Sequence, residues 1–216
     1  MNESLPRPDA AATTAADLGD FVSASPSSYH AVDTAAKRLE GAGFSRLDES
    51  VPWALTPGTG HYVIRDGALI AWMNPTVTEA APRFRVFGSH TDSPAFKLKP
   101  GGEYTVEGTR QVGVEIYGGP LLNSWLDREL AFAGRLSLAD GSIVLARTGP
   151  IARIPQLAIH LDRQVNEGLA LDKQRHTAPV IGLADLAEAD IIELLAASAG
   201  VDAETVVGHD AYTIPT

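Results

Sequence analysis

The sequence predicts an α/β protein that carries an additional β-rich part, and three observations lead to this fold class. Two amphipathic helical patterns come first and are followed by strand patterns, which is the element order of an α/β sandwich. After Pro100 the chain becomes rich in glycine and in short alternating runs, which is typical of antiparallel strands. A further helical pattern covers Asp190–Ala199, and Gly200 is its stop signal.

The two N-terminal helical patterns are separated by a Ser-Pro pair. Apolar residues recur at helical spacing from about Ala15 to Ala24, and Ser25-Pro26 interrupts this pattern. Ser27 or Ser28 then provides the N-cap of a second helix, which two glycines terminate. The sequence therefore predicts a pair of consecutive helices.

The strand patterns that follow include one hairpin and one isolated run. His61–Arg65 and Ala68–Met73 are predicted strands, and Asp66-Gly67 between them is a tight-turn signal. Arg83–Phe87 is apolar and β-prone, so we expect a buried strand that leads directly to His90.

The second half of the chain predicts an antiparallel β unit. Asp140-Gly141 is a hairpin signal between the last two of four short strand patterns, which cover residues 104–106, 111–117, 133–138 and 142–147. We expect a flexible leader over residues 1–15, an α/β part over 16–99 and a separate β-rich part over 100–216.

Composition excludes several classes of protein and of site. The net charge of −10 argues against a nucleic-acid partner, which would require clustered Lys and Arg. The absence of cysteine leaves His, Asp and Glu to hold any transition metal. No apolar run approaches the roughly 20 residues needed to cross a bilayer, and the N-terminus lacks the apolar core of a secretory signal. We expect a cytoplasmic protein without a membrane partner.

His90 and Asp92 form the first candidate site. They follow the apolar run after a Gly-Ser pair, where strands of α/β enzymes often present polar side chains. An imidazole is a common metal ligand, and a nearby carboxylate can hold its second nitrogen. The alternative is a structural turn in which His90 is a cap and Asp92 binds the loop backbone.

Two further segments are candidates on weaker grounds. His160 ends an apolar run and is followed by charged residues, so it is either a functional imidazole at a strand end or a structural histidine of the β unit. Leu121–Leu130 combines apolar residues, Trp125 and paired charges. This segment is either a buried turn with a local salt bridge or part of an oligomer surface, where Trp and Arg are enriched.

Several motifs occur together in one order along the chain. They are Ser25-Pro26 before Tyr29-His30, Gly88–Pro94 with Lys97, Val114–Gly119, Trp125–Leu130, and Arg153–Pro155 followed by Ala158–Arg163. From about residue 17 onward, this series resembles the N-terminal half of the M18 family of metalloaminopeptidases, the aspartyl aminopeptidase group.

The resemblance implies a zinc exopeptidase with two metal ions that removes N-terminal residues, often acidic ones, from peptides. It implies an α/β catalytic domain interrupted by a β-rich domain that builds homo-oligomers, from dimers up to a dodecamer. By resemblance, His90 is a zinc ligand and Asp92 orients it in the catalytic site. His160 is either a metal ligand or a substrate-binding group that reaches a neighbouring subunit, and its position in the β-rich part favours the substrate role.

The family's remaining metal ligands have no counterpart in this sequence, which contains no Glu-Glu pair. We therefore expect an incomplete N-terminal half that is inactive by itself. One alternative is a truncated, non-catalytic paralogue that acts as an assembly module. Another is a hydrolase of a different class that uses His90 and Asp92 without a metal.

Overall fold

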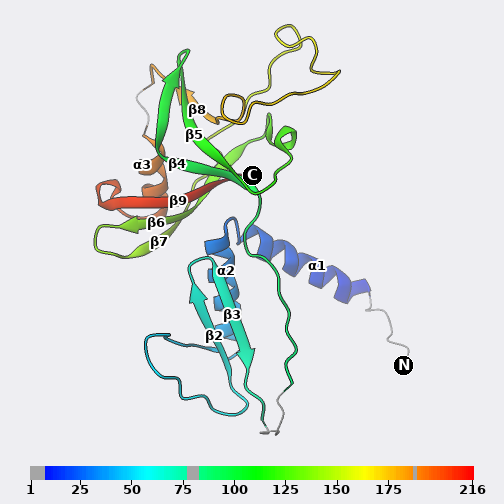
Figure 1. Cartoon of the computed structure of the whole chain (residues 1–216), viewed down its shortest axis with the longest axis vertical. Helices are drawn as coiled ribbons and strands as arrows, with labels where there is room; N and C mark the ends of the chain where they lie inside the picture. Colours follow the sequence, from blue (N-terminus) through cyan, green and yellow to red (C-terminus); the bar gives the residue numbers. More distant parts are fainter. Residues whose placement is uncertain (1–7, 77–82, 187–188) are drawn as a thin grey trace. The chain divides into compact units, whose positions relative to one another are not determined.

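The computed structural model describes residues 8–76, 83–186 and 189–216, and the chain divides into two compact units (Figure 1). The units are Met1–Asp92 and Ser93–Thr216, each with its own sheet. The division precedes the boundary expected near residue 100, because strand β4 (Ala95–Val106) begins before that point and belongs to the second sheet. The predicted α/β class is confirmed.

Helix α1 (Pro8–Ser23) covers residues 8–15, for which the sequence predicted a flexible leader. The segment is rich in alanine, the residue with the highest helix propensity, and its proline lies in the first turn, where a missing N–H is tolerated. The hydroxyls of Thr13 and Thr14 donate to the carbonyl oxygens one turn earlier. The first seven residues of the expected leader lie outside the described residues.

Helix α2 (Ser28–Gly41) confirms the second predicted helix and its cap. The Ser27 side chain accepts from the backbone N–H of His30, and Gly43 follows the helix with a left-handed φ of 85°. The helix lies against a small sheet of order β1-β2-β3, made of β1 (Ser45–Arg46), β2 (Gly60–Arg65) and β3 (Ala68–Met73) (Figure 1). The predicted hairpin is confirmed, with Asp66 at positive φ in its turn.

The predicted buried strand at Arg83–Phe87 is wrong. The segment has no strand pairing, and the side chains of Phe84, Val86 and Phe87 are 84%, 85% and 95% exposed. An apolar, β-prone run becomes a strand only where another strand supplies hydrogen-bond partners, and the described residues supply none here. The sequence revealed the apolar character of this segment but not whether a partner strand was present.

The second unit is built on one antiparallel sheet of order β7-β6-β9-β4-β5-β8 (Figure 1). Besides β4, its elements are β5 (Thr109–Tyr117), the 3₁₀ helix η1 (Leu122–Trp125), β6 (Leu130–Leu138), β7 (Ile143–Arg147), β8 (Val180–Leu183), α3 (Ile191–Ala199), the 3₁₀ helix η2 (Ala203–Thr205) and β9 (Val206–Pro215). Strands β8 and β9 were not predicted, and β9 lies in the middle of the sheet. The Asp140-Gly141 turn between β6 and β7 is confirmed, with Gly141 at a φ of 86°.

The core of the second unit lies between this sheet and α3. Phe96, Phe132 and Leu195 are fully buried in it, and α3 packs against β6 and β7. Asp190 forms a capping box with Glu193, and Gly200 ends α3 in the left-handed conformation, as predicted. Among the described residues, no helix combines the length and the apolar character that a membrane span requires.

Candidate functional site

His90 lies in an irregular segment at the end of the first unit, with 78% of its side chain exposed. Its Nδ1 is 2.6 Å from the main-chain oxygen of Asp92, whereas the nearest carboxylate oxygen of Asp92 is 3.7 Å away. The neighbouring Thr91 hydroxyl donates to the carbonyl oxygen of Gly67 in the β2–β3 turn, at 2.5 Å. The loop that carries His90 is therefore attached to the small sheet.

The contact to Asp92 decides which ring nitrogen of His90 is available to a metal. A carbonyl oxygen only accepts hydrogen bonds, so the short contact assigns the proton to Nδ1 and leaves the lone pair on Nε2. This is the tautomer that a ligating histidine needs when its second nitrogen is held by the protein. The main-chain oxygen of Asp92, rather than its carboxylate, provides this support.

The residues at His90 fit zinc only in part. Zinc binds four ligands in most protein sites, and His90 offers one nitrogen on an exposed side chain. Within residues 8–76, 83–186 and 189–216, no three His, Asp or Glu side chains come together as a metal site. His90 therefore fits as one ligand of a centre whose other ligands this part of the chain does not gather.

His160 belongs to the second unit and lies in a turn rather than at the end of a strand. The turn is closed by the amides of Leu161 and Asp162, which donate to the carbonyl oxygen of Ala158. Leu157, Ile159 and Leu161 around it are 59%, 44% and 74% exposed. The apolar run before His160 suggested a strand, but the structure places this run on the surface.

The Leu121–Leu130 segment combines buried and exposed parts. Trp125 packs edge-on against Phe96, with ring centroids 5.0 Å apart, while Leu121 is 75% exposed. Among the ion pairs found in the described residues, none involves the charged side chains of this segment, so the alternative of a local salt bridge is not supported. Asp127 instead binds the backbone of residues 154–156.

Three charged side chains from three neighbouring strands form a cluster that sequence reasoning missed. Asp210 of β9 contacts Lys97 of β4 at 2.5 Å and Arg135 of β6 at 3.0 Å. Burial alone would raise the pKa of Asp210, but the hydrogen bonds from Lys97 and Arg135 outweigh it and lower the pKa. The Asp210 hydrogen bond in turn raises the pKa of Lys97. Sequence reasoning missed the cluster because it did not predict strand β9. Asp210 therefore had no expected place in the sheet.

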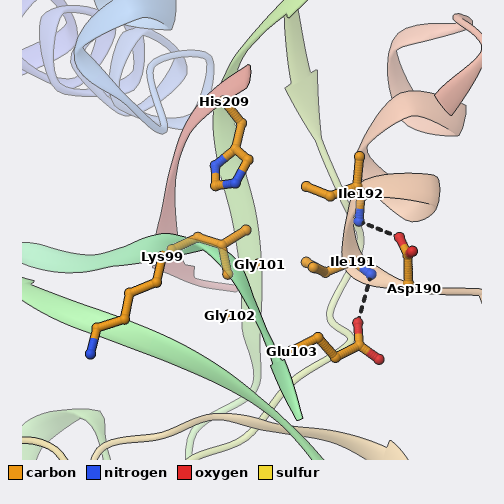
Figure 2. A pocket seen from close by; sticks show the side chains of 9 residues that line it. Lys99, Gly101, Gly102, Glu103, Asp190, Ile191, Ile192 and His209 are labelled. Carbon is orange, nitrogen blue, oxygen red and sulfur yellow. Dashed lines mark hydrogen bonds between the residues drawn. The ribbon is translucent and has the colours of Figure 1, made fainter. Parts of the chain in front are cut away.

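A cavity of about 150 Å³ lies elsewhere in the second unit, between β4, β9 and the start of α3 (Figure 2). The Nδ1 atom of His209 is buried without a hydrogen-bond partner, and burial lowers the pKa of this histidine. The first α3 amides are already bound, with Ile191 donating to Glu103 and Ile192 to Asp190 (Figure 2). None of the predicted site residues lines this cavity.

Comparison with known proteins decides the family. The profile of a family described as aminopeptidase I zinc metalloprotease (M18) matches residues 21–216. The chain belongs to the M18 family. It is 54% identical over 200 residues to a probable M18 family aminopeptidase 2 of Streptomyces avermitilis, which covers 91% of this chain and 46% of that protein. The similarly named Mycobacterium leprae protein is 41% identical over 207 residues, 93% of this chain and 48% of its own length.

Solved structures of M18 proteins match the fold of this chain. The structure of the Ape4 and Nbr1 complex has a TM-score of 0.85 and 32% identity, covering 92% of this chain and 43% of that chain. The structure of the S. cerevisiae mApe1 dodecamer has a TM-score of 0.69 and 28% identity, covering 91% and 46%. The M18 chain described here thus spans about half the length of the relatives that it matches.

Proposed function

We propose that this chain forms the N-terminal half of a zinc-dependent M18 aminopeptidase that removes N-terminal residues, preferentially acidic ones, from peptides. The observation that carries the proposal is the match of the family profile to residues 21–216, which include the His90 and His160 motifs. Acidic preference rests on the resemblance to the aspartyl aminopeptidase group. Residues 1–20 lie outside this match and are given no part in the proposed function.

In this proposal His90 is a zinc ligand through Nε2, and Asp92 orients its imidazole. The 2.6 Å contact supports this role, because it holds Nδ1 and leaves Nε2 for a metal. When two zinc ions are bound, they supply an acidified water and polarise the scissile carbonyl. His160 binds the substrate from a neighbouring subunit, which agrees with its exposed turn in the β-rich unit.

The exposed apolar segment before His90 is the proposed docking site for the rest of the catalytic domain. Phe84, Val86 and Phe87 are each more than four-fifths exposed, and the leading relatives are about twice as long as the match. Burial of such side chains provides about 1.5–3 kcal/mol each. A complementary polypeptide that pairs with this segment would hold His90 beside the remaining ligands.

We also propose that the β-rich unit assembles into homo-oligomers built from dimers. Support comes from the solved relative described as a dodecamer and from exposed leucines at residues 121, 157 and 161. Assembly is required in this proposal, because His160 would act on the substrate of an adjacent subunit.

The test compares the chain alone with the chain co-expressed with the part of the Streptomyces avermitilis relative that follows the match. We expect no hydrolysis of aspartyl- or glutamyl-p-nitroanilide by the chain alone. The co-expressed pair should hold two equivalents of zinc and turn over the substrate, as measured by metal analysis and absorbance. His90→Ala should remove zinc and activity, whereas His176→Ala, a change at another exposed histidine, should remove neither.

Two results would contradict the proposal. Robust turnover by the chain alone would show that no complementary half is needed. A stable pair that assembles without zinc and without turnover would favour the non-catalytic assembly module. Light scattering on the same samples measures the oligomeric state, and a strict monomer would contradict the assembly claim.

A further inference from the structure

Asp127 makes two hydrogen bonds to one short stretch of backbone. Its N–H donates to the carbonyl oxygen of Ile154 at 2.9 Å, and its carboxylate Oδ1 accepts from the N–H of Gln156 at 3.1 Å. Its φ of 54° is in the left-handed region, which Asp adopts more readily than most residues. This conformation allows the backbone and the side chain of one residue to hold both ends of the 154–156 stretch.

The same stretch is held on its other side by strand β8. Arg153 and Val180 exchange two backbone hydrogen bonds, at 3.0 and 2.8 Å. Ile154 is 1% exposed and belongs to the core of the second unit. These hydrogen bonds therefore hold the backbone up to Gln156. Along the sequence, the bond from Gln156 to Asp127 is the last of them before the loop begins.

Beyond Gln156 the chain enters a long surface loop. In the described structure, the backbone hydrogen bonds from Leu157 to His176 join residues of the loop to one another. The next contacts with the rest of the unit are Leu171, which packs against the core, and Gln174, whose side chain contacts Lys99 and Glu115. His160 follows Gln156 by four residues, so the Gln156 contact is the nearer of the two attachments.

We propose that Asp127 is a positioning residue that fixes the start of the loop carrying His160. A four-residue connection spans at most about 14 Å, so a fixed Gln156 limits the region that the imidazole can reach. Release of Gln156 would let the loop move from Ile154 onward and would increase the entropy lost when His160 binds a ligand. The contribution of His160 rests on the function proposed above, whereas the attachment by Asp127 does not.

The test measures amide hydrogen exchange in the 216-residue chain and in three variants. Asp127→Gly keeps the left-handed backbone accessible and removes the carboxylate, and we expect exchange at the Gln156 amide to become about tenfold faster or more. Asp127→Asn retains an acceptor oxygen and a residue that tolerates this φ, so protection should be restored to within about threefold. The matched control is Asp140→Gly, because the Asp140 carboxylate accepts from Ser142 in a turn outside this loop.

Exchange of the β6 amides in the same experiment shows whether each variant is folded. Unchanged exchange at Gln156 in folded Asp127→Gly would overturn the proposal, as would equal acceleration in Asp140→Gly. In the co-expressed active pair, Asp127→Gly should raise KM for aspartyl-p-nitroanilide more than it lowers kcat, and Asp127→Asn should restore KM. Faster exchange with an unchanged KM would show that Asp127 attaches the loop but does not position His160 for the substrate, and would overturn the positioning role.

Discussion

The two units differ in how completely they bury their own apolar side chains. The second unit places Phe96, Phe132 and Leu195 at zero exposure between a six-stranded sheet and α3. The first unit buries Tyr62, whose hydroxyl donates to Glu40 of α2, but leaves Phe84 and Phe87 exposed. The second unit thus has a packed core under its sheet, with exposed leucines outside it at residues 121, 157 and 161, whereas the first leaves aromatic side chains of one segment almost fully exposed.

This difference assigns separate tasks to the two units. The second unit holds the start of the loop that carries His160 through the hydrogen bonds to residues 153–156. The first unit carries His90, the predicted metal ligand, directly after its exposed aromatic residues. We therefore expect mutations of these apolar residues to affect different properties, namely folding stability in the second unit and association with a partner in the first.

The largest contrast is expected between Phe132 and Phe87. Phe132→Ala should lower the free energy of unfolding of the second unit by about 3–5 kcal/mol, because it leaves a cavity in a packed core. Phe87→Ala should change the free energy of unfolding of the first unit by no more than about 0.5 kcal/mol, because the ring is 95% exposed. Urea unfolding with hydrogen exchange at residues of each unit measures both values.

In the co-expressed pair, Phe87→Ala is expected to have a larger effect than in the isolated chain. There, Phe87→Ala should weaken association with the complementary half, whereas it has little effect on the isolated chain. A large loss of stability from Phe87→Ala in the isolated chain would mean that this side chain is buried in solution, and the contrast between the units would be wrong.

Gly134 provides a smaller test of how tightly the second unit is packed. A Cβ built at this position would lie 1.9 Å from the carbonyl oxygen of Asp210, so Gly134→Ala must push β6 and β9 apart. We expect the free energy of unfolding to fall by about 1–3 kcal/mol. Gly19→Ala in α1 is the matched control, and it should stabilise the helix by up to about 1 kcal/mol because its Cβ meets nothing within 4 Å. Thermal unfolding of both variants decides this prediction.

The smallest expected effect concerns the Asp210 cluster. Because the pKa of folded Asp210 is lowered, its carboxylate adds stability above the unfolded pKa of about 3.9, and this stability is lost as pH falls through the folded pKa. Asp210→Asn should therefore lower the free energy of unfolding by about 1 kcal/mol at pH 7 and by less near pH 3.

The control for this pH effect comes from the first unit. The ion pair of Glu49 with Arg65 lowers the pKa of Glu49 but is exposed, with 79% of the Arg65 side chain accessible to solvent, so Glu49→Gln should cost less than Asp210→Asn at pH 7. Urea unfolding at the two pH values compares the variants. An equal loss for Asp210→Asn at pH 3 and pH 7 would show that the charge of Asp210 does not contribute.

Local sequence signals predicted the elements whose stability is local. Ser27 before α2, Asp66-Gly67 and Asp140-Gly141 in the hairpins, and Gly200 after α3 all lie where the sequence placed them. Each depends on a backbone conformation or on a hydrogen bond within a few residues. Such features can be read from a short window of sequence.

The sequence missed β9 and the full length of β4 for different reasons. Strand β9 pairs with β6 residues 68–85 positions earlier, and its Gly208, His209 and Asp210 interrupt an apolar pattern. Strand β4 continues past Pro100 and two glycines through an irregularity between Leu98 and Glu103, where the sequence placed a domain boundary. Pairing with a distant segment determines β9. Strand β4 pairs mainly with the neighbouring β5, and its full length was missed because Pro100 and two glycines interrupt its pattern.

The contacts of the candidate site also divide into local ones, which the sequence can predict, and distant ones, which it cannot. His90 and Asp92 are two residues apart, so their contact follows from the local turn. Asp127 and Gln156 are separated by 29 residues, and neither carries a local signal for the other. The contact of Asp127 with the His160 loop became visible only when the fold brought these segments together.

The central position of β9 has a consequence for synthesis on the ribosome. Until residues 206–215 have left the exit tunnel, the facing edges of β6 and β4 both lack their middle neighbour, and the sheet exists only as separate hairpins. Unpaired strand edges of this kind recruit other chains, so the nascent protein is open to aggregation during this interval. Chaperones that shield strand edges should therefore raise the yield of folded protein.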